Sequence, residues 1–366
     1  MNLRILGIRG VPAAHGGFET FAEYLAVYLQ KRNWNVTVYC QHQGKGDIYE
    51  DEWQGIKRVN IPVKGDGPLS TIIFDLKANW HASKSKELCL TLGYNTAIFA
   101  ALLRIKGIKN VMNMDGIEWK RQKWGGVAKF WFWLNDWAGC WLANHLVADH
   151  PKIKEHLSTR VSPDKVTTIA YGAEKIDSAD IHALDQYDLK PKEYAVLIAR
   201  AEPENSILEV VQAWSAKPRG KKLVVLGKYL DSHEYQKTVK AAASDEVVFI
   251  GAVYEKSVVS ALRYYAMFYV HGHQVGGTNP SLVESLGAGN AILAHDNPYN
   301  RWVCGDGAIF FDGKQACAQQ IERLISDTSL QKQLSQQSEK RFDESFRWDY
   351  ILRDYEALLS RPEFSH

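Results

Sequence analysis

The segment 269–289 combines glycines, a helix-start signal and a carboxylate in a spacing that suits a phosphorylated ligand. Asn279 is placed to cap a helix whose first residue is Pro280, which leaves unpaired backbone N–H groups aimed at the preceding glycines. Glu284 follows on the same helical face, where its carboxylate could accept two hydrogen bonds from the vicinal hydroxyls of a ribose. This pattern predicts a nucleoside diphosphate site, and the alternative is a capped helix with a solvated glutamate.

The predicted donor contacts in this segment belong to the glycine turn, the cap and the first helical turns. They are Gly276, Gly277, Thr278, Asn279, Ser281 and Glu284, and His273 is placed to reach a hydroxyl. His271 and His273 alternate onto one strand face like a metal pair. No third ligand follows at metal spacing, so we predict no metal site.

Arg200 directly follows a predicted strand at 195–199. Its guanidinium could clamp a diphosphate and offset the charge that grows on a departing phosphate. A surface ion pair with Glu202 or Glu204 is the alternative.

Asp115 and Glu118 follow another predicted strand, at 111–114. Either carboxylate could contact a sugar hydroxyl or act as a base. Capping of the loop by Asp115 is the alternative interpretation.

The first predicted strand, 3–8, ends in a glycine-rich loop that leads into a helix. Gly16 and Gly17 could let backbone N–H groups approach a phosphate or sugar, although glycine richness is equally typical of a flexible turn. The G-x-G-x-x-G spacing is absent, and the second strand ends at 40–43 without an acidic residue for a ribose. Both features argue against a dehydrogenase.

Short apolar runs alternate with amphipathic ones, which predicts βαβ units and parallel sheets. The first series of strands is expected at 3–8, 35–40, 56–61, 88–92, 111–114, 145–148 and 166–170, with helices at 18–31, 96–105 and 127–142. The second series is expected at 195–199, 223–226, 247–250, 267–270, 291–294 and 309–311, with helices at 207–216, 257–265, 281–286 and 316–325. A polar connection at 173–193 separates them, and 329–359 is helical by pattern. Two Rossmann-like halves follow, with the ligand expected between them at the carboxyl ends of the strands.

Composition narrows the class of protein further. A chain of 366 residues exceeds what one core supports, and a formal charge of +2 argues against a nucleic-acid binder. Five scattered cysteines without a C-x-x-C pair predict buried, reduced thiols. We recognise no secretion signal and no membrane span, so we expect a cytoplasmic protein.

A basic and aromatic segment lies in the first half of the chain. Between 104 and 129 there are seven Lys or Arg against two Asp or Glu, and Phe130, Trp133, Trp137 and Trp141 follow at helical spacing. The segment suits docking onto an anionic membrane surface or recognition of a lipid diphosphate. Core packing of the aromatic stripe is the more common explanation of such spacing.

Four segments together resemble glycosyltransferase family 4 in order and spacing across nearly the whole chain. They are the glycine loop, Ile169-Ala170-Tyr171-Gly172-Ala173-Glu174, Ile198-Ala199-Arg200 and the Gly276–Glu284 helix entry. Segments 7–21, 115–121 and 275–284 are also similar to a bacterial subset that contains capsule and exopolysaccharide rhamnosyltransferases.

The family resemblance implies an α/β GT-B fold, with two Rossmann-like domains facing a central cleft and a C-terminal helix crossing back. The acceptor-binding domain would span 1–172 and include a returning helix at about 343–366, and the nucleotide-sugar-binding domain would span 190–342. The resemblance also implies retention of configuration, with no required metal or cofactor. Glu284 takes the ribose role and Arg200 the diphosphate role, whereas Gly276 and Asn205 replace the family's usual first glutamate and its usual lysine.

We therefore expect a retaining glycosyltransferase of bacterial surface polysaccharide synthesis. By the closer resemblance it moves L-rhamnose from dTDP-rhamnose to a lipid-linked or saccharide acceptor. A nucleotide-sugar epimerase or a phosphorylase on the same fold, or a non-catalytic sugar-binding protein, are the alternatives. The expected location is the cytoplasm, with peripheral contact to the inner face of an anionic plasma membrane.

The expected residue roles fall into three sets. The catalytic residues would be Asp115, Arg200 and Glu118. Gly16 and Gly17 join the donor contacts named above. The acceptor or sugar contacts would be His15, Glu19, Asp115 and Glu118.

Overall fold

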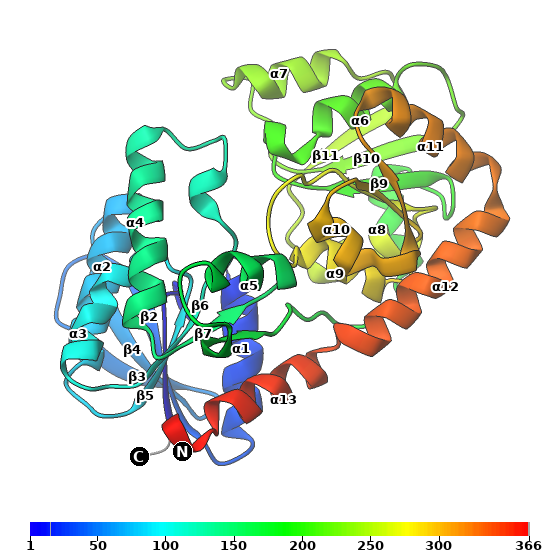
Figure 1. Cartoon of the computed structure of the whole chain (residues 1–366). Helices are drawn as coiled ribbons and strands as arrows, with labels where there is room; N and C mark the ends of the chain where they lie inside the picture. The colour runs from blue at the N-terminus through cyan, green and yellow to red at the C-terminus, as the bar shows by residue number, and fades with distance from the viewer. Residues whose placement is uncertain (15, 365–366) are drawn as a thin grey trace. The chain divides into compact units, whose positions relative to one another are not determined.

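The computed structural model describes residues 1–14 and 16–364 (Figure 1). Contacts divide the chain into two compact units. Unit 1 comprises Met1–Tyr171 and the chain from Trp348 onwards, and unit 2 comprises Gly172–Arg347. Each unit is an α/β domain with its own sheet and its own apolar core.

Unit 1 is built on an eight-stranded sheet in the order β3-β4-β2-β1-β5-β6-β7-β8. The strands are β1 (Asn2–Leu6), β2 (Asn35–Gln43), β3 (Tyr49–Trp53), β4 (Ile56–Val63), β5 (Leu88–Leu92), β6 (Asn110–Asn113), β7 (His145–Ala148) and β8 (Val166–Thr168). The α-helices are α1 (Gly17–Gln30), α2 (Pro68–Ala82), α3 (Ala101–Ile105), α4 (Gly126–Leu142), α5 (Pro151–Ser158) and α13 (Trp348–Leu359). Every neighbouring strand pair is parallel except β3 with β4.

The direction of each crossover places the helices of unit 1 on two faces of the sheet. Helices α2 to α5 each lead to a strand nearer the β8 edge, whereas α1 leads back from β1 to β2. Because parallel crossovers are right-handed, α1 covers one face and α2 to α5 cover the other. The side chains of β1, which alternate between the two faces, agree with this placement. Leu3 and Ile5 pack in the core under α1, and Leu6 packs in the core under α2.

The C-terminal helix α13 belongs to unit 1 and packs beside α1. The ring of Trp348 stacks on Tyr24 with centroids 4.9 Å apart. The Tyr28 hydroxyl donates to Glu356 at 2.8 Å, and the Asn113 side-chain amide at the end of β6 donates to the Tyr355 hydroxyl at 2.8 Å. The last helix therefore ties α1 to the strand that leads into the Asp115 loop.

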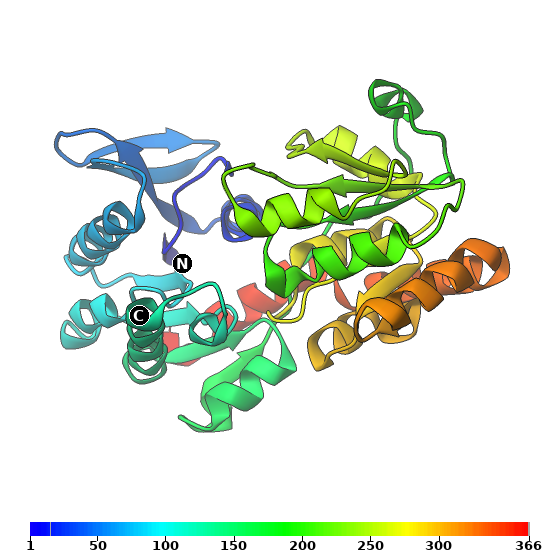
Figure 2. The ribbon, with the colours of Figure 1, turned by 90° about the horizontal axis from the view of Figure 1, so that it is seen from above.

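Unit 2 carries a six-stranded, fully parallel sheet in the order β11-β10-β9-β12-β13-β14. The strands are β9 (Tyr194–Ile198), β10 (Lys222–Leu226), β11 (Val247–Gly251), β12 (Tyr269–His271), β13 (Ile292–His295) and β14 (Ala308–Phe311). The helices are α6 (Ile207–Trp214), α7 (Glu234–Ala241), α8 (Lys256–Tyr264), α9 (Pro280–Gly287), α10 (Pro298–Cys304), α11 (Lys314–Ser326) and α12 (Thr328–Ser345). Figure 2 shows the same ribbon from above.

Several predicted elements differ from those observed. The helix expected at 96–105 is a 3₁₀ turn, Ala97–Ala100, followed by the short α3, and the single helix expected at 329–359 is broken between α12 and α13. Strand β3 was not predicted, because its sequence Tyr-Glu-Asp-Glu-Trp is acidic and exposed at the sheet edge, where charge protects against further pairing. Helices α2, α5, α7 and α10 were also missed.

Buried thiols, by contrast, follow the sequence expectation. Each of the five cysteines is free and buried in the structure, which confirms the predicted reduced thiols. No helix among the described residues is long and apolar enough to span a membrane.

Candidate active site

The predicted anion site lies where β12 ends and α9 begins, at the carboxyl edge of the unit 2 sheet. The Asn279 side chain accepts a hydrogen bond from the backbone N–H of Ser281 at 3.0 Å, and Pro280 is the first helical residue. Both capping predictions are thereby confirmed. Gly276 has a φ of +139°, a conformation that favours glycine, and a Cβ added there would meet nothing within 4 Å.

A row of free donors precedes the cap. Among the described residues, the N–H groups of Val275, Gly276 and Gly277 donate to no protein acceptor. All three residues are partly exposed, so a ligand can reach them. Unpaired donors in front of a helix N-terminus form a site for an anion.

Glu284 is held in place by Arg263, a buried residue of α8. The two side chains form an ion pair at 2.6 Å, in which the Arg263 side chain is 6% exposed and that of Glu284 is 41% exposed. Arg263 also donates to the Ser281 hydroxyl at 3.0 Å, and that hydroxyl lies 2.8 Å from the Tyr269 hydroxyl. The Glu284 carboxylate is therefore fixed but reachable, whereas the Ser281 side chain is occupied within the protein.

Arg200 is exposed and free. No carboxylate among the described residues pairs with it, so the alternative of an ion pair with Glu202 or Glu204 is not observed. Asn205, which stands where the family has a lysine, is 2% exposed and donates to the Arg200 carbonyl at 2.8 Å. Asn205 thus braces the loop that presents Arg200 and does not itself face a ligand.

Hydrogen bonds join the loop that carries Arg200 to the loop at 272–277. The Gln274 N–H donates to the Glu204 carbonyl at 2.9 Å, and the Gln274 side chain donates to the Ser206 hydroxyl at 2.9 Å. The backbones of the two loops also approach each other closely at Gly272. A Cβ at this position would lie 2.1 Å from the Asn205 carbonyl oxygen, so no larger residue fits there. Arg200 and residues 275–277 are consequently presented by one braced pair of loops.

The two histidines of the segment stack on each other. The rings of His271 and His273 have centroids 4.3 Å apart and an interplanar angle of 10°. Burial, with His273 and His295 nearby, lowers the pKa of His271 well below its ordinary value, so the ring is neutral. Asn297 and Asn300 both donate to the His273 carbonyl, which fixes the backbone at the start of the loop.

In unit 1 the glycine-rich loop is held by carboxylates of α1. The Glu19 carboxylate accepts from the Arg9 N–H at 3.2 Å, and Glu23 accepts from the Ala13 N–H at 2.6 Å. Glu19, a predicted sugar contact, is 9% exposed and serves the loop itself. Gly16 and Gly17 stand at the N-terminus of α1, and His15 lies outside the described residues.

Glu118 is fully engaged within its own loop. Its two carboxylate oxygens accept from Arg121 at 2.9 Å and from Trp124 at 3.0 Å, and its N–H donates to the Tyr94 hydroxyl at 2.8 Å. Burial acts to raise the pKa of Glu118, but Arg121 and the hydrogen bond from Trp124 outweigh it and lower that pKa. A carboxylate with a lowered pKa and two partners is a poor base, so the geometry does not support that role.

Asp115 keeps an unusual backbone conformation. Its φ is +53°, and its N–H donates to the Asn113 side chain at 2.9 Å. A left-handed conformation costs a non-glycine residue about 1–2 kcal/mol, and such positions concentrate at functional sites. Asp115 is partly exposed at the carboxyl edge of the unit 1 sheet, directly beyond β6.

Sequence reasoning missed the residues that act through long-range contacts. In unit 2 these are Arg263, Asn297 and Asn300. In unit 1, the 2%-exposed Asp136 accepts from Trp119 at 2.7 Å and pairs with Arg160 at 2.6 Å, which anchors the Glu118 loop. Local spacing carried no signal for Arg263 or Asp136, because their partners lie on other elements. Asn297 could have been found, since Asn297-Pro298 repeats the cap signal of Asn279-Pro280.

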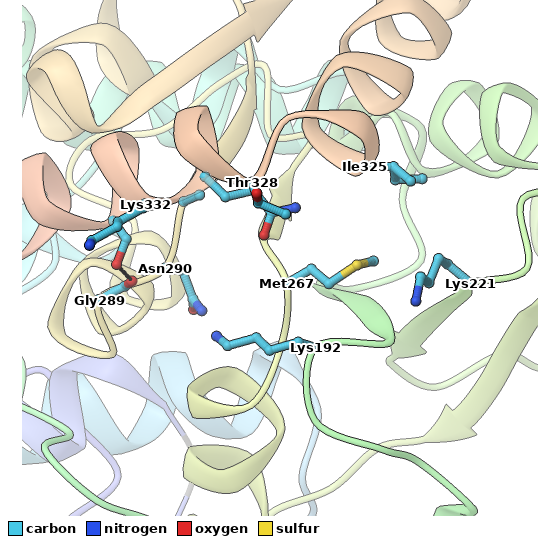
Figure 3. A pocket seen from close by; sticks show the side chains of 11 residues that line it. Lys192, Lys221, Met267, Gly289, Asn290, Ile325, Thr328 and Lys332 are labelled. Atoms are coloured by element: carbon cyan, nitrogen blue, oxygen red, sulfur yellow. Dashed lines mark hydrogen bonds between the residues drawn. The ribbon is translucent and has the colours of Figure 1, made fainter.

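A separate cavity of unit 2 lies away from these loops. It measures about 490 Å³ and is lined by residues directly before β9, β10, β12 and β13, among them Lys192, Lys221 and Met267. Figure 3 shows their side chains opposite Thr328 and Lys332 of α12. The cavity is therefore at the amino ends of the strands and contains none of the predicted site residues.

Across residues 1–14 and 16–364, no three His, Cys, Asp or Glu side chains are grouped to hold a metal ion.

Family models match the two halves of the chain separately. Residues 184–341 match the model of glycosyl transferases group 1, and residues 1–174 match the model of a domain of unknown function, DUF1972. No curated protein matches the chain in sequence.

Solved structures match nearly the whole chain. Sucrose-phosphate synthase from Thermosynechococcus elongatus has a TM-score of 0.79 at 17% identity, with 98% of each chain covered. Anabaena HepE, solved in complex with UDP and glucose, has a TM-score of 0.76 at 13% identity, covering 98% of this chain and 99% of that chain. An α,α-trehalose-phosphate synthase from Burkholderia xenovorans, solved with glucose-6-phosphate, has a TM-score of 0.75 at 12% identity, covering 99% and 100%.

These comparisons define the fold. Residues 184–341, which make up most of unit 2, match the glycosyl transferases group 1 model, and the two α/β units, each built on a largely parallel sheet, have the GT-B fold of the solved structures. This is the fold that the resemblance predicted.

Proposed function

We propose that the chain transfers a sugar from a nucleoside diphosphate donor, with retention of configuration and without a required metal. Unit 2 binds the donor, and unit 1 binds the acceptor. The observation that carries the proposal is the arrangement at α9, where unpaired N–H groups at 275–277 precede a capped helix and Arg263 fixes Glu284 beyond it.

In this proposal the residues of unit 2 act on the departing diphosphate. The N–H groups of 275–277 and the positive end of α9 bind its oxygens, and Arg200 stabilises the charge that develops as the bond to the sugar breaks. An oxocarbenium-like sugar forms, and the acceptor hydroxyl attacks from the face that the diphosphate leaves. A phosphate oxygen takes the acceptor's proton, so no protein base is needed, which agrees with the engaged carboxylate of Glu118.

The identity of the donor rests on the resemblance and on Glu284. The segments similar to rhamnosyltransferases favour L-rhamnose carried on thymidine diphosphate. Glu284 as the acceptor of two vicinal hydroxyls favours a ribonucleotide carrier over thymidine diphosphate, because a ribose offers two such hydroxyls and the deoxyribose of thymidine diphosphate offers one. HepE, solved with UDP, is an example of a neighbour with a ribonucleotide.

The acceptor is proposed to be a lipid-linked or free saccharide of bacterial surface polysaccharide synthesis, met at the inner face of the plasma membrane. Asp115 is the residue of unit 1 placed to orient its hydroxyl. Similarity to rhamnosyltransferases at 115–121 supports this assignment.

A donor panel tests the proposal. Uridine, thymidine and guanosine diphosphate sugars are each incubated with the purified chain, with and without a lipid-linked saccharide analogue, and released nucleoside diphosphate and product mass are measured together. Acceptor-dependent release with a matching mass increase is the expected result. Conversion of the donor without acceptor would instead indicate an epimerase, and saturable binding without any release would indicate a sugar-binding protein.

A further inference from the structure

Helix α2 buries three polar residues beside Phe74, Ala78 and Ala82, and it exposes a stripe of apolar ones. Ser70, Asp75 and Asn79 are at most 6% exposed, while Leu69 and Trp80 are 69% and 54% exposed. Ile73 and Leu76 stand between them, so the exposed apolar residues follow an i, i+4, i+7, i+11 stripe along the outer side of the helix. Phe74, Ala78 and Ala82 already pack the inner side of α2 against the core, so the outward stripe is left without a partner in the unit and marks an interaction surface.

Helix α4 exposes a second stripe, the aromatic one noted in the sequence. Phe130 and Trp141 are each 62% exposed and Trp133 is 40% exposed, so the core-packing explanation is wrong for these three rings. The rings form a chain, with Phe130–Trp133 centroids 6.0 Å apart and Trp137–Trp141 centroids 5.1 Å apart.

Both stripes belong to one surface. Helices α2, α3 and α4 cover the same face of the unit 1 sheet, so their outer sides point away from that sheet together, and the two views show them neighbouring one another (Figures 1 and 2). We call this surface the outer face. Its exposed apolar members are Leu69, Ile73, Leu76, Trp80, Ile98, Ile105, Val127, Phe130, Trp133 and Trp141.

The exposed charge of the helical segments that form the outer face has a single sign, and an exposed carboxylate, Asp66, stands just before α2. Segments 68–86, 96–109 and 122–142 are described throughout, and their only carboxylates, Asp75 and Asp136, are buried. The cations of these segments are Lys77, Lys84, Lys86, Arg104, Lys106, Lys109, Lys123 and Lys129. The ammonium of Lys84 lies 3.8 Å from the centroid of the Trp80 ring, an amphipathic pair suited to a polar–apolar boundary.

We propose that the outer face docks onto an anionic lipid bilayer, with the apolar stripes entering the interface and the surrounding cations meeting lipid headgroups. Exposed tryptophans prefer the interfacial region, and cations beside them are attracted by a negative surface potential. A second copy of the chain is a poor occupant, because a symmetric dimer would set the cations of these three segments against one another, and the segments themselves hold no exposed carboxylate to pair them.

The outer face also reaches the acceptor side of unit 1. Helices α2 and α4 both begin at the carboxyl edge of the sheet, and the loop that carries Asp115 leads directly into α4. Docking through α2 and α4 would therefore hold the Asp115 loop next to the bilayer surface, where a lipid-linked acceptor is found. This last step rests on the proposed function, whereas docking itself does not.

Vesicle flotation of the full chain, without donor or acceptor, tests the proposal. We expect binding to vesicles of phosphatidylcholine mixed with phosphatidylglycerol, weaker binding to phosphatidylcholine alone, and loss of binding as salt rises. The double variant Trp80→Ser/Phe130→Ser should bind about tenfold more weakly or worse, because both rings lose their interfacial burial. Tyr254→Ser, at an 88%-exposed tyrosine of unit 2, is the matched control and should bind like the wild type.

Three results would overturn the proposal. They are no binding of the wild type to either vesicle, equal binding by Trp80→Ser/Phe130→Ser, and binding to anionic vesicles that salt does not affect. Sedimentation of the same variants tests whether a second copy of the chain occupies the face. If the wild type is a dimer, the double variant is a monomer and neither binds vesicles, the outer face serves self-association. Vesicle binding without sugar transfer in the donor panel would contradict the proposed function and leave the docking proposal intact.

Discussion

Arg200 is the exposed cation of the unit 2 site that carries no partner among the described residues. A guanidinium left free at the carboxyl edge can move onto a diphosphate without first breaking an ion pair. We expect Arg200→Ala to lower kcat about 100-fold, a loss of about 3 kcal/mol of transition-state stabilisation, measured by steady-state kinetics with circular dichroism as a check of the fold.

A matched control for that substitution is Arg323→Ala, which removes an exposed arginine of α11. Its kcat should equal that of the wild type. Wild-type turnover by a folded Arg200→Ala enzyme would contradict the assigned role.

Arg263 acts on the donor through Glu284 and is a positioning residue. One nitrogen of its guanidinium, Nη2, reaches both the Glu284 carboxylate and the Ser281 hydroxyl, and the lysine side chain, which is one bond shorter, cannot place its ammonium at the same point. We expect Arg263→Lys to raise KM for the donor about tenfold while kcat changes little, because a looser Glu284 weakens binding of a part of the donor that does not react.

Arg301→Lys provides the comparison, since Arg301 pairs with Asp296 at the surface of α10. It should leave both kinetic constants unchanged. A fall in kcat at unchanged KM for Arg263→Lys would show that Arg263 serves the chemical step instead.

At the scale of elements, the sequence predicts the start of helix α9 but does not predict helix α2. The cap, the proline and the glycines of 276–280 are local signals that fix their own backbone, so the loop and helix were predicted correctly. Helix α2 escaped because Ser70, Asp75 and Asn79 are buried among its apolar residues, which blurs the usual amphipathic pattern. The ion pair between Arg263 and Glu284 also escaped, because two different elements contribute it.

The buried carboxyl of α2 makes the stability of unit 1 depend on pH. Burial raises the pKa of Asp75 to about 7, although a hydrogen bond from Thr96 opposes the shift. Because the folded-state pKa lies above the unfolded value, the stability from protonated Asp75 is complete at acid pH and is lost as pH rises through about 7.

We therefore expect the free energy of unfolding to fall with rising pH more in the wild type than in Asp75→Asn. The difference between about pH 4 and pH 8 should be on the order of 4 kcal/mol. Urea titration followed by tryptophan fluorescence reports on unit 1, since just Trp214 and Trp302 of the chain's tryptophans belong to unit 2. Asp66→Asn, at an exposed site, is the control, and parallel curves for the wild type and Asp75→Asn would refute the assignment.

At the scale of the whole molecule, each of the two units supplies a different set of residues to the proposed reaction. Unit 2 supplies the free N–H row, Arg200 and the fixed Glu284, whereas unit 1 supplies Asp115 and the outer face. The family models divide the chain in the same way, with the glycosyl transferases group 1 model on unit 2 and a separate model on unit 1. The proposal accordingly assigns donor binding to unit 2 and acceptor binding to unit 1.

Calorimetric binding of uridine diphosphate and its 2′-deoxy analogue, to the wild type and to Glu284→Gln, tests the central claim most directly. Glu284 is proposed to hold the ribose diol, so the wild type should bind the deoxy analogue about tenfold more weakly. Glu284→Gln should bind both ligands more weakly and discriminate less between them. Equal discrimination by the wild type and Glu284→Gln would contradict the account, because the ribose would then be held elsewhere.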